Sequence, residues 1–425
     1  MKLYATYKSI GEYRHYNFCR FCFSNPLIPA INLGYVPLAG SFIKSKKYLS
    51  DEKFYSLEIG FCQNCFLLQS TNVIDKDLLF KDYFYHSSVI KTLTNHFNEI
   101  AQELEMQTKN SPKPFIVEIG CNDGTLINAL SKLKINTLGI DPATNIVQPL
   151  IKKGLPIVND YFSEDLAKKI VKIYGKADAI CSFNVLAHIE DMEDVLTGVR
   201  TLLKKDGFLI FETHYLRNLL EEMQYDMIYH EHQYYYSLMT LQNFFAIHNM
   251  EIYDVKPIKI HAGSMRYYVQ NKNGGKNPIS KNVKTLLKKE KSLGFHKLKT
   301  YLSYAQKITK TKHELLSLLD SLKRDNKIIA GYGASGRGTI IMNYCGLDKK
   351  YLDYVIDDAP AKQGAYTPGT HLEIKGSDIL KSKNRPDYVV LFAWSFLDEI
   401  KEKNKEYLQN GGKFIVPLPK VQIIS

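Results

Sequence analysis

The feature that most constrains the fold of this chain is the stretch at residues 117–126, V-E-I-G-C-N-D-G-T-L. Its pattern predicts a buried strand that runs into a glycine-rich turn and then into a helix. Gly120 and Gly124 have no Cβ, so the backbone at these positions can turn sharply and approach a ligand closely. The amides at the start of the helix would then face that ligand. The stretch therefore predicts the ligand-binding first half of a β-α-β unit.

The acidic residues in and after this stretch indicate what kind of ligand it binds. Glu118 and Asp123 would repel a phosphate group, whereas they would attract a cationic or zwitterionic ligand. A second apolar run, at residues 137–140, ends in Asp141, and an acid at this position of a β-α-β unit usually binds ribose hydroxyls. Together these features predict a nucleoside ligand without a pyrophosphate, and S-adenosylmethionine fits that description.

Two cysteine pairs near the N-terminus, Cys19 with Cys22 and Cys62 with Cys65, each have C-x2-C spacing. Two such pairs can place four thiolates at the corners of a tetrahedron, which suits zinc. A redox role for one pair would need a thioredoxin-like β-α-β context, which the surrounding sequence lacks. A site with four protein ligands is closed to substrate, so we predict a structural zinc ion in this segment.

Strand and helix patterns alternate over residues 113–272, which predicts a mainly parallel, doubly wound α/β sheet. The alternation resumes at Lys327, and a second glycine-rich turn at residues 331–338 indicates a second Rossmann-like domain. We expect the strands of the first sheet near residues 115–119, 136–140, 155–158, 177–183, 207–212, 251–257 and 265–270. The predicted parts of the chain are a zinc-binding subdomain at residues 1–75, a cofactor-binding core at 76–275, a helical linker at 276–325 and a C-terminal Rossmann-like domain at 326–425.

Residues just beyond the strand ends are the candidates for function, because ligands of doubly wound sheets bind outside the carboxyl ends of the strands. The predicted fourth strand runs into Asn184 and His188, and the fifth is followed by Y-H-E-H-Q-Y-Y-Y-S at residues 229–237. The predicted cofactor-binding residues are Glu118, Gly120, Asn122, Asp123, Gly124, Asp141 and Asn184.

The segment at residues 229–237 is crowded with ionisable groups. His230 and His232 lack the i, i+4 spacing of a helical metal-binding pair. Glu231 and the histidines could instead supply a general base and an orienting carboxylate, and Tyr229 could supply a hydroxyl donor. From the residues alone, a surface or packing role for this segment stays open.

The charge of the chain bears on its partners. The 425 residues carry a formal net charge of +12, and the lysines are scattered. This pattern is typical of a solvated basic surface, although a nucleotide diphosphate or a nucleic acid would also suit it. No apolar run approaches the ~18 residues that span a membrane. The N-terminus has no apolar signal-peptide core, so we expect a cytoplasmic protein without a membrane partner.

Taken together, these motifs resemble the nucleotide-sugar C-methyltransferases, which are class I S-adenosylmethionine-dependent enzymes that build branched deoxysugars. The resemblance covers nearly the whole chain and rests on the order of the motifs. After the two zinc knuckles come E-x-G-x-N-D-G at 118–124, Y-H-E-H at 229–232, H-x-G-S-x-R at 261–266, G-Y-G-A at 331–334, D-D-x-x-x-K-Q-G at 357–364 and P-G-T at 368–370.

The resemblance implies a class I methyltransferase core between the zinc subdomain and the C-terminal domain, and methylation of carbon 3 of a nucleotide-linked 4-keto sugar. His232 would remove the C-3 proton with Glu231 alongside, and the resulting enolate would attack the methyl group of the cofactor. Zinc would take no part in that step. The residues that the resemblance assigns to catalysis are His232, Glu231, Tyr229, His188 and one of the two tyrosines Tyr83 and Tyr85.

Three other functions stay open at this point. The same scaffold could methylate an oxygen or a nitrogen of a sugar or another small molecule. Zinc and a positive charge also suit a nucleic-acid-binding protein, but the zinc segment is not notably basic and its aromatic residues are not interleaved with arginine. The third is a binding module without catalysis. We expect a monomer that binds a nucleotide sugar and no nucleic acid.

Overall fold

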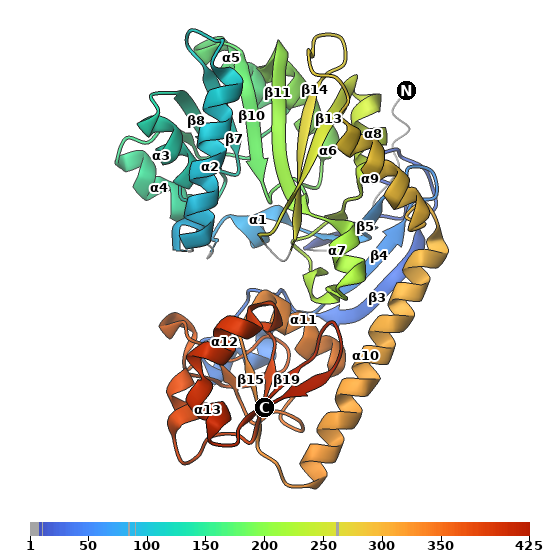
Figure 1. Ribbon diagram of the computed structural model, residues 1–425, viewed down its shortest axis with the longest axis vertical. Coiled ribbons are helices and arrows are strands. Elements are labelled where there is room, and N and C mark those ends of the chain that lie inside the picture. The colour runs from blue at the N-terminus through green and yellow to red at the C-terminus, as the bar shows by residue number, and fades with distance from the viewer. Residues whose placement is uncertain (1–7, 11, 84–85, 90, 261–262) are drawn as a thin grey trace.

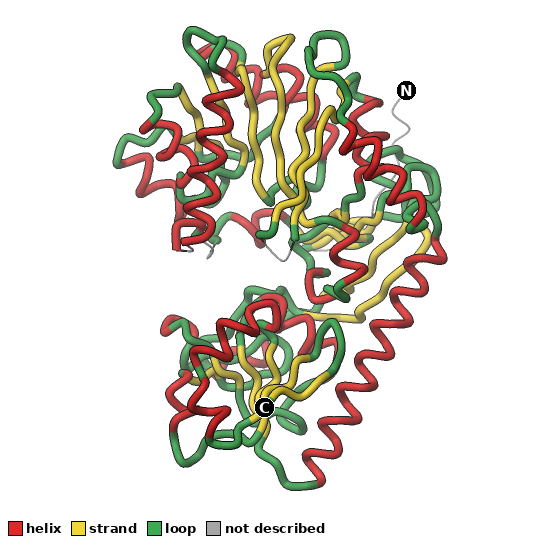
Figure 2. The backbone as a smooth tube through the Cα atoms, viewed as in Figure 1, coloured by secondary structure: helices red, strands yellow, loops and turns green. Residues whose placement is uncertain are grey.

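The computed structural model describes residues 8–10, 12–83, 86–89, 91–260 and 263–425. The chain forms two lobes, and the long helix α10 (Leu298–Arg324) runs along one side of both (Figure 1). The larger lobe contains the N-terminal sheets and the central sheet, and the smaller lobe contains the C-terminal sheet. Strands fill the middle of each lobe, with helices outside them (Figure 2).

The central sheet has the strand order β13-β14-β11-β10-β7-β8-β9. Neighbouring strands are parallel from β11 to β9, and β14 is antiparallel to both β11 and β13. The strands are β7 (Phe115–Ile119), β8 (Asn136–Ile140), β9 (Ile157–Val158), β10 (Ala177–Phe183), β11 (Leu203–His214), β13 (Met250–Ile258) and β14 (Ser264–Asn271). This confirms the mainly parallel, doubly wound sheet and the position of each predicted strand.

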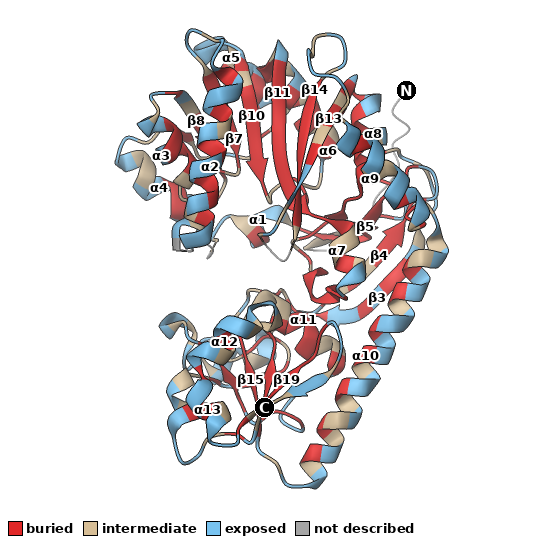
Figure 3. Ribbon diagram, in the orientation of Figure 1, coloured by how far each residue is buried: buried red, intermediate tan, exposed pale blue. Residues whose placement is uncertain are grey.

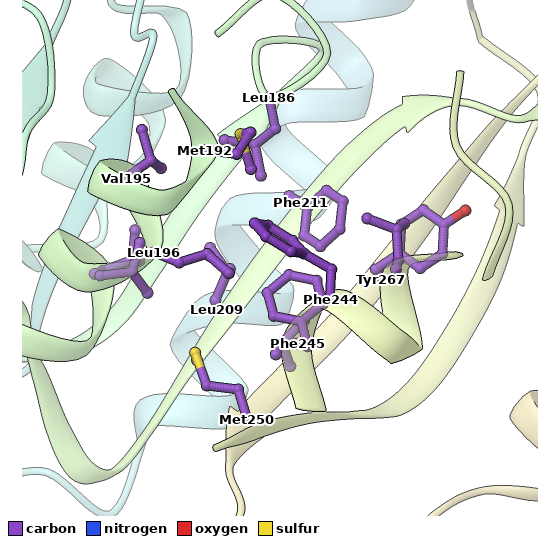
Figure 4. Packing of buried hydrophobic residues seen from close by; sticks show 14 of the residues in the cluster. Leu186, Met192, Val195, Leu196, Leu209, Phe211, Phe244, Phe245, Met250 and Tyr267 are labelled. Carbon is purple, nitrogen blue, oxygen red and sulfur yellow. The ribbon is translucent and has the colours of Figure 1, made fainter. Parts of the chain in front are cut away.

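Helices cover both faces of this sheet, so its strands are buried on both sides (Figure 3). One face packs against α2 (Lys91–Thr108) and α3 (Thr125–Lys132). The other face packs against α5 (Glu164–Tyr174), α6 (Met192–Leu202) and α8 (Leu238–Ile247). Figure 4 shows side chains of this second layer, where residues of α6 and α8 pack on β11. A strand covered on both faces needs an unbroken apolar run, which is the pattern in the sequence.

Capping residues fix where these helices begin and end. The Oγ of Ser163 accepts a hydrogen bond from the amide of Leu166, 3.1 Å away, at the start of α5. That helix ends at Gly175, whose φ of 82° suits glycine. The remaining helices of the larger lobe and the connecting segment are α1 (Lys76–Phe80), α4 (Thr144–Lys152), α7 (Leu216–Glu221) and α9 (Lys281–Ser292), with short 3-10 helices at η2 (Ser87–Val89) and η3 (Tyr225–Met227).

The N-terminal residues form two small antiparallel sheets, of order β1-β2-β6 and β12-β5-β4-β3. Their strands are β1 (Lys8–Ile10), β2 (Tyr13–His15), β3 (Ile28–Val36), β4 (Tyr55–Phe61), β5 (Leu68–Ser70), β6 (Asn72–Ile74) and β12 (Tyr234–Tyr235). Strand β12 belongs to the segment at residues 229–237, and it pairs Tyr234 with Gln69 and Tyr235 with Leu68. The predicted catalytic segment is therefore hydrogen-bonded into the N-terminal sheet.

The connection between β3 and β4 reaches the smaller lobe. It includes the 3-10 helix η1 (Lys46–Asp51). The Oγ1 of Thr339 donates to the carbonyl of Ala39 at 3.2 Å, and the carboxylate of Glu52 accepts from the amide of Gly369 at 2.9 Å. Figure 1 shows part of the blue N-terminal segment inside the lower lobe. The range predicted as a zinc subdomain thus contains a loop that packs on the C-terminal domain.

The C-terminal sheet has the order β17-β16-β15-β18-β19-β20 and is parallel except for β20. Its elements are β15 (Ile329–Tyr332), α11 (Gly336–Cys345), β16 (Val355–Ile356), η4 (Pro360–Lys362), β17 (Ile374–Lys375), η5 (Ser377–Lys381), β18 (Tyr388–Leu391), η6 (Trp394–Phe396), α12 (Leu397–Lys403), α13 (Lys405–Gln409), β19 (Lys413–Val416) and β20 (Gln422–Ile424). Helices α10 and α11 cover one face, and α12 and α13 cover the other. This is the predicted second Rossmann-like sheet. Within the described ranges, no helix is both long and apolar enough to cross a membrane.

Candidate active site

A cavity of about 1470 Å³ lies beyond the carboxyl ends of the central strands, between that sheet and the N-terminal sheets. Such strand ends carry the ligand sites of doubly wound folds. The predicted site residues in its wall are Tyr83, Glu118, Gly120, Asn122, Asp141, Asn184, His188, Tyr229 and His232. Asp123, Gly124 and Glu231 are not part of the wall, and Tyr85 lies outside the described residues. Residues far apart in the sequence are thus gathered around one space.

The turn after β7 has the geometry that its glycines predict. Gly120 has a φ of 75°, and a Cβ there would lie 2.2 Å from the Cγ2 of Val185. Gly124 has a φ of 71° at the start of α3. Asp123 accepts hydrogen bonds from the amide of Ser88 and the hydroxyl of Thr125, at 2.8 Å and 2.7 Å. Asp123 therefore fastens the turn to the segment before α2 rather than facing the cavity.

Glu118 is buried at the end of β7, and its Oε2 has no hydrogen-bond partner among the described residues. The pKa of Glu118 lies well above its usual value, because the carboxyl group is buried and the carboxylates of Asp141 and Asp123 lie near it. A cation bound in the cavity would relieve both effects. This part of the wall therefore suits a positively charged ligand.

Asp141, at the end of β8, is held by backbone amides. Its carboxylate accepts from the amides of Asn122 and Ala143, at 2.8 Å and 2.9 Å. Burial raises the pKa of Asp141, and these hydrogen bonds lower it. Each carboxylate oxygen can accept a second hydrogen bond, so the group can still bind a pair of hydroxyls.

Three wall residues after β9 are not among the predicted site residues. Asp160, Tyr161 and Phe162 line the cavity next to Asp141. These residues follow the third strand of the sheet. Because ligands of doubly wound sheets bind beyond the strand ends, this position in the sequence could have identified them. They add an acid and two aromatic rings to the part of the wall that contains Asp141.

Three histidines and a tyrosine meet at the other side of the cavity. The ring of His232 lies 4.9 Å from that of His188, 4.5 Å from that of His214 and 4.0 Å from that of Tyr229, between ring centroids. His214 ends β11 and was not predicted, although its place at the end of the fifth strand is a usable signal. The pKa of His188 lies well below its usual value, because the ring is buried and His232 lies beside it.

The backbone fixes the tautomer of His232. Its Nδ1 lies 2.7 Å from the carbonyl oxygen of Met227, which can only accept, so Nδ1 carries the proton and the basic lone pair is on Nε2. The residue before Met227 is the fully buried Asp226. Asp226 accepts from Arg337 at 2.8 Å and from the indole of Trp394 at 2.9 Å, both in the C-terminal domain. The loop that holds His232 is therefore anchored to the smaller lobe.

Glu231 and His230 contact tyrosines from earlier in the chain. The hydroxyl of Tyr83 donates to Glu231 at 3.2 Å. Burial raises the pKa of Glu231 to about 7, and the hydrogen bond from Tyr83 lowers it. His230 packs edge-on against the ring of Tyr55, with centroids 5.9 Å apart, and burial lowers its pKa to about 4. Glu231 thus acts on the cavity through Tyr83, and His230 is a packing residue.

The four predicted zinc ligands lie together. Their sulfur atoms are all within 4.8 Å of one another, with 3.4 Å between Cys19 and Cys65 and 3.5 Å between Cys22 and Cys62. Zinc–sulfur bonds of about 2.3 Å in a tetrahedron need sulfur separations of about 3.8 Å. The two pairs lie in separate turns of the same kind. In each turn the residue after the second cysteine has a positive φ, which is 57° at Phe23 and 67° at Phe66.

Family models match almost all of this architecture. A zinc binding domain matches residues 19–80, a methyltransferase domain matches 93–255, and a C-methyltransferase C-terminal domain matches 259–419. The C-methyltransferase NovU of Streptomyces niveus is 29% identical over 407 residues, which cover 96% of each chain. The chain belongs to this C-methyltransferase family.

Other proteins match a smaller share of this C-methyltransferase. The ubiquinone biosynthesis O-methyltransferase of Colwellia psychrerythraea is 30% identical over 105 residues, 23% of this chain and 41% of that protein. The magnesium protoporphyrin IX methyltransferase of Synechocystis PCC 6803, solved with bound S-adenosylmethionine, aligns at a TM-score of 0.31 and 15% identity. That alignment covers 41% of this chain and 78% of the other.

The C-methyltransferase uses S-adenosylmethionine as cofactor and carries a zinc site, and its own residues fit both. The partnerless buried oxygen of Glu118 suits the cationic methionine part of the cofactor. The four cysteine sulfurs suit a closed tetrahedral zinc ion. The cofactor and the metal are those that the sequence predicts.

Proposed function

We propose that this C-methyltransferase acts on carbon 3 of a nucleotide-linked 4-keto deoxysugar, with His232 as the base that forms the enolate. The observation that carries the proposal is the state of His232. The ring is buried in the cavity wall, and the carbonyl of Met227 fixes its tautomer so that Nε2 is the basic atom. The histidine lies in the same cavity as the turn that suits the methyl donor.

The residues around His232 can stabilise the charge that develops on the C-4 oxygen when the C-3 proton moves to Nε2. Burial and the nearby charge of Glu231 hold the pKa of Tyr229 well above its usual value, so its hydroxyl keeps its proton. His188 stays neutral and can donate one hydrogen bond. Donors placed at a developing oxyanion are typically worth about 10² to 10³ in rate each.

The methyl donor supplies an electrophilic carbon on sulfur: the bond from C-3 to the methyl carbon forms as the methyl–sulfur bond breaks, and S-adenosylhomocysteine leaves. On the protein side, Glu118 would meet the charged methionine part and Asp141 the ribose hydroxyls. Asp160 and Phe162 would border the adenine ring of the donor. The proton taken from C-3 stays on Nε2 of His232 until the product leaves, and it then passes to solvent.

Solvent exchange at carbon 3 tests this function. In deuterium oxide, with S-adenosylhomocysteine bound in place of the methyl donor, a nucleotide 4-keto-6-deoxysugar should gain one deuterium at C-3. With S-adenosylmethionine, the product should gain one methyl group at the same carbon. A methylated product whose C-3 proton is retained would instead indicate methylation of an oxygen or a nitrogen and would refute the proposal.

Replacing Glu118 with glutamine should weaken donor binding. The substitution keeps the shape of the side chain but removes the negative charge that would face the methionine part. A hydrogen bond to a charged group contributes about 1.5 to 3 kcal/mol, so the KM for S-adenosylmethionine should rise about 10- to 100-fold. Calorimetric titration with S-adenosylhomocysteine measures the same loss directly.

The matched control is Glu290→Gln. Glu290 is fully buried outside the cavity, where it accepts from the amides of Leu238 and Met239 at 2.8 Å each. Its replacement should lower the melting temperature and leave the KM for S-adenosylmethionine unchanged. Equal effects of both variants on KM would show that the loss of a buried charge, and not a contact with the donor, is responsible.

A further inference from the structure

A buried arginine lies inside the first zinc knuckle. Arg20, between Cys19 and Cys22, is 7% exposed and stacks on the ring of Tyr234, with its guanidinium carbon 4.4 Å from the centroid. Within the described part of the chain, no carboxylate forms an ion pair with it. A buried charge needs compensation. Four thiolates around Zn²⁺ carry a net charge of −2, so the knuckle itself supplies the balancing charge.

The hydrogen bonds of Arg20 lead to the residue next to the base. Its Nη1 donates to the Oε1 of Gln233 at 2.6 Å, and its Nη2 donates to the Gln233 carbonyl at 3.3 Å. Its Nε and Nη2 also donate to the Oε1 of Gln69 and the carbonyl of Ser70, each at 3.1 Å. Arg20 therefore joins the knuckle, strand β5 and Gln233 into one polar network.

Gln233 in turn contacts the loop that carries the second histidine. Its Nε2 donates to the carbonyl of His188 at 2.9 Å, and its backbone amide donates to the carbonyl of Ala187 at 2.8 Å. The amide of Ser70 donates to the carbonyl of Gln233 at 2.9 Å. Gln233 is 1% exposed, so water does not replace these partners.

Arg20 also decides which way the Gln233 amide points. The guanidinium only donates and the His188 carbonyl only accepts. A flipped amide would put its NH₂ group against the guanidinium and its oxygen against the carbonyl, so both hydrogen bonds would be lost. The orientation that remains holds the His188 backbone at a fixed distance from the chain that carries His232.

We propose that Arg20 and Gln233 are positioning residues through which the zinc subdomain sets the arrangement of His188 and His232. This rests on the proposed function, in which these two histidines serve the C-3 enolate. A displacement of about 1 Å at a reacting centre can cost about 100-fold in rate. The zinc ion then supports catalysis without touching the substrate, because its knuckle holds the arginine that holds Gln233.

The test compares Gln233→Leu and Arg20→Met with the wild-type full chain. Each should lower kcat about 30- to 100-fold while the KM for S-adenosylmethionine and the zinc content stay unchanged, since the donor turn and the cysteines are intact. Arg20→Lys keeps the charge and one donor, so it should recover part of the loss. A kcat within about twofold of wild type in both Gln233→Leu and Arg20→Met would overturn the proposal.

The matched control is Gln63→Met. Gln63 holds the position in the second knuckle that Arg20 holds in the first, immediately after the leading cysteine, but its side chain is exposed. This variant should keep wild-type kcat. A loss equal to that of Arg20→Met would mean that any change in a knuckle disturbs the fold, and would also overturn the proposal.

Gln233→Glu gives a readout that a purely structural role would not move. The carboxylate still accepts from Arg20 but cannot donate to the His188 carbonyl, and its charge favours imidazolium at the nearby histidines. The acid limb of the kcat profile should move to higher pH, and histidine NMR titration without substrate should show the same shift. The NMR result is independent of the reaction, so an absent shift refutes the positioning role, whereas absent C-3 exchange in wild type refutes the proposed function.

Discussion

His232→Asn is expected to lower kcat for methyl transfer by about 10² to 10⁴, the range that a positioned general base contributes. Asparagine can place its Nδ2 where Nδ1 of the imidazole lies, so the hydrogen bond to the Met227 carbonyl, 2.7 Å long in the wild type, can be kept. The basic Nε2 has no counterpart in asparagine. Deuterium exchange at C-3 should fall with kcat, while binding of S-adenosylhomocysteine should stay unchanged, because the donor turn is not altered.

His230→Asn is the control for this variant, because it removes the neighbouring buried histidine of the same segment. His230 packs against Tyr55 and does not line the cavity. Its loss should lower the melting temperature and leave kcat within a few-fold of wild type. If His230→Asn abolished exchange and His232→Asn did not, the base would have been assigned to the wrong residue.

The central fold could be predicted because its signals are local. Apolar runs mark the central parallel strands, and β7 is buried at all five positions. The glycines of the first turn require a left-handed backbone, and Gly120 and Gly124 have it. The two C-x2-C pairs specify their own turns. None of these features depends on how distant parts of the chain meet.

The rest of the site depends on contacts between parts of the chain that are far apart in the sequence. Glu231 was expected beside His232, but residues 229–232 form a turn in which the amide of His232 donates to the carbonyl of Tyr229 at 2.9 Å, and the Glu231 carboxylate accepts from the Tyr83 hydroxyl. The pairing of β12 with β5 joins two short strands that carry no pairing signal in the sequence. Without that pairing, nothing indicates that Arg20 lines the same cavity as His232.

The loop that carries the base is fixed by both neighbouring parts of the chain. Gln233, after His232, is held by Arg20 and by strand β5 of the N-terminal sheet. Asp226, before Met227, is held by Arg337 and Trp394 of the C-terminal domain. Since short segments on either side of His232 are anchored to separate parts, loss of either anchor should loosen the base while the central sheet stays folded.

Cys62→Ser is expected to abolish zinc binding and to unfold the N-terminal sheets. Structural zinc sites contribute about 10 to 16 kcal/mol of apparent binding free energy in small zinc domains, and the ion is what joins the two knuckles to each other. Wild type should contain about one zinc per chain by elemental analysis, and the variant close to none. Calorimetry should show a separate unfolding transition, for these sheets, at lower temperature than in the wild type.

The same variant should also lose methyl transfer, although a zinc ion with four cysteine ligands has no open position for substrate. Unfolding of the knuckle releases Arg20, and unfolding of β5 releases β12, so Gln233 and His232 lose their shared support. The control is Cys345→Ser, which removes a buried thiol of α11 whose sulfur lies 3.7 Å from the Tyr225 hydroxyl. It should keep zinc and most of its activity. A Cys62→Ser protein that lacks zinc yet keeps wild-type kcat would contradict this prediction. It would show that the N-terminal sheet holds Gln233 and His232 in place without the metal.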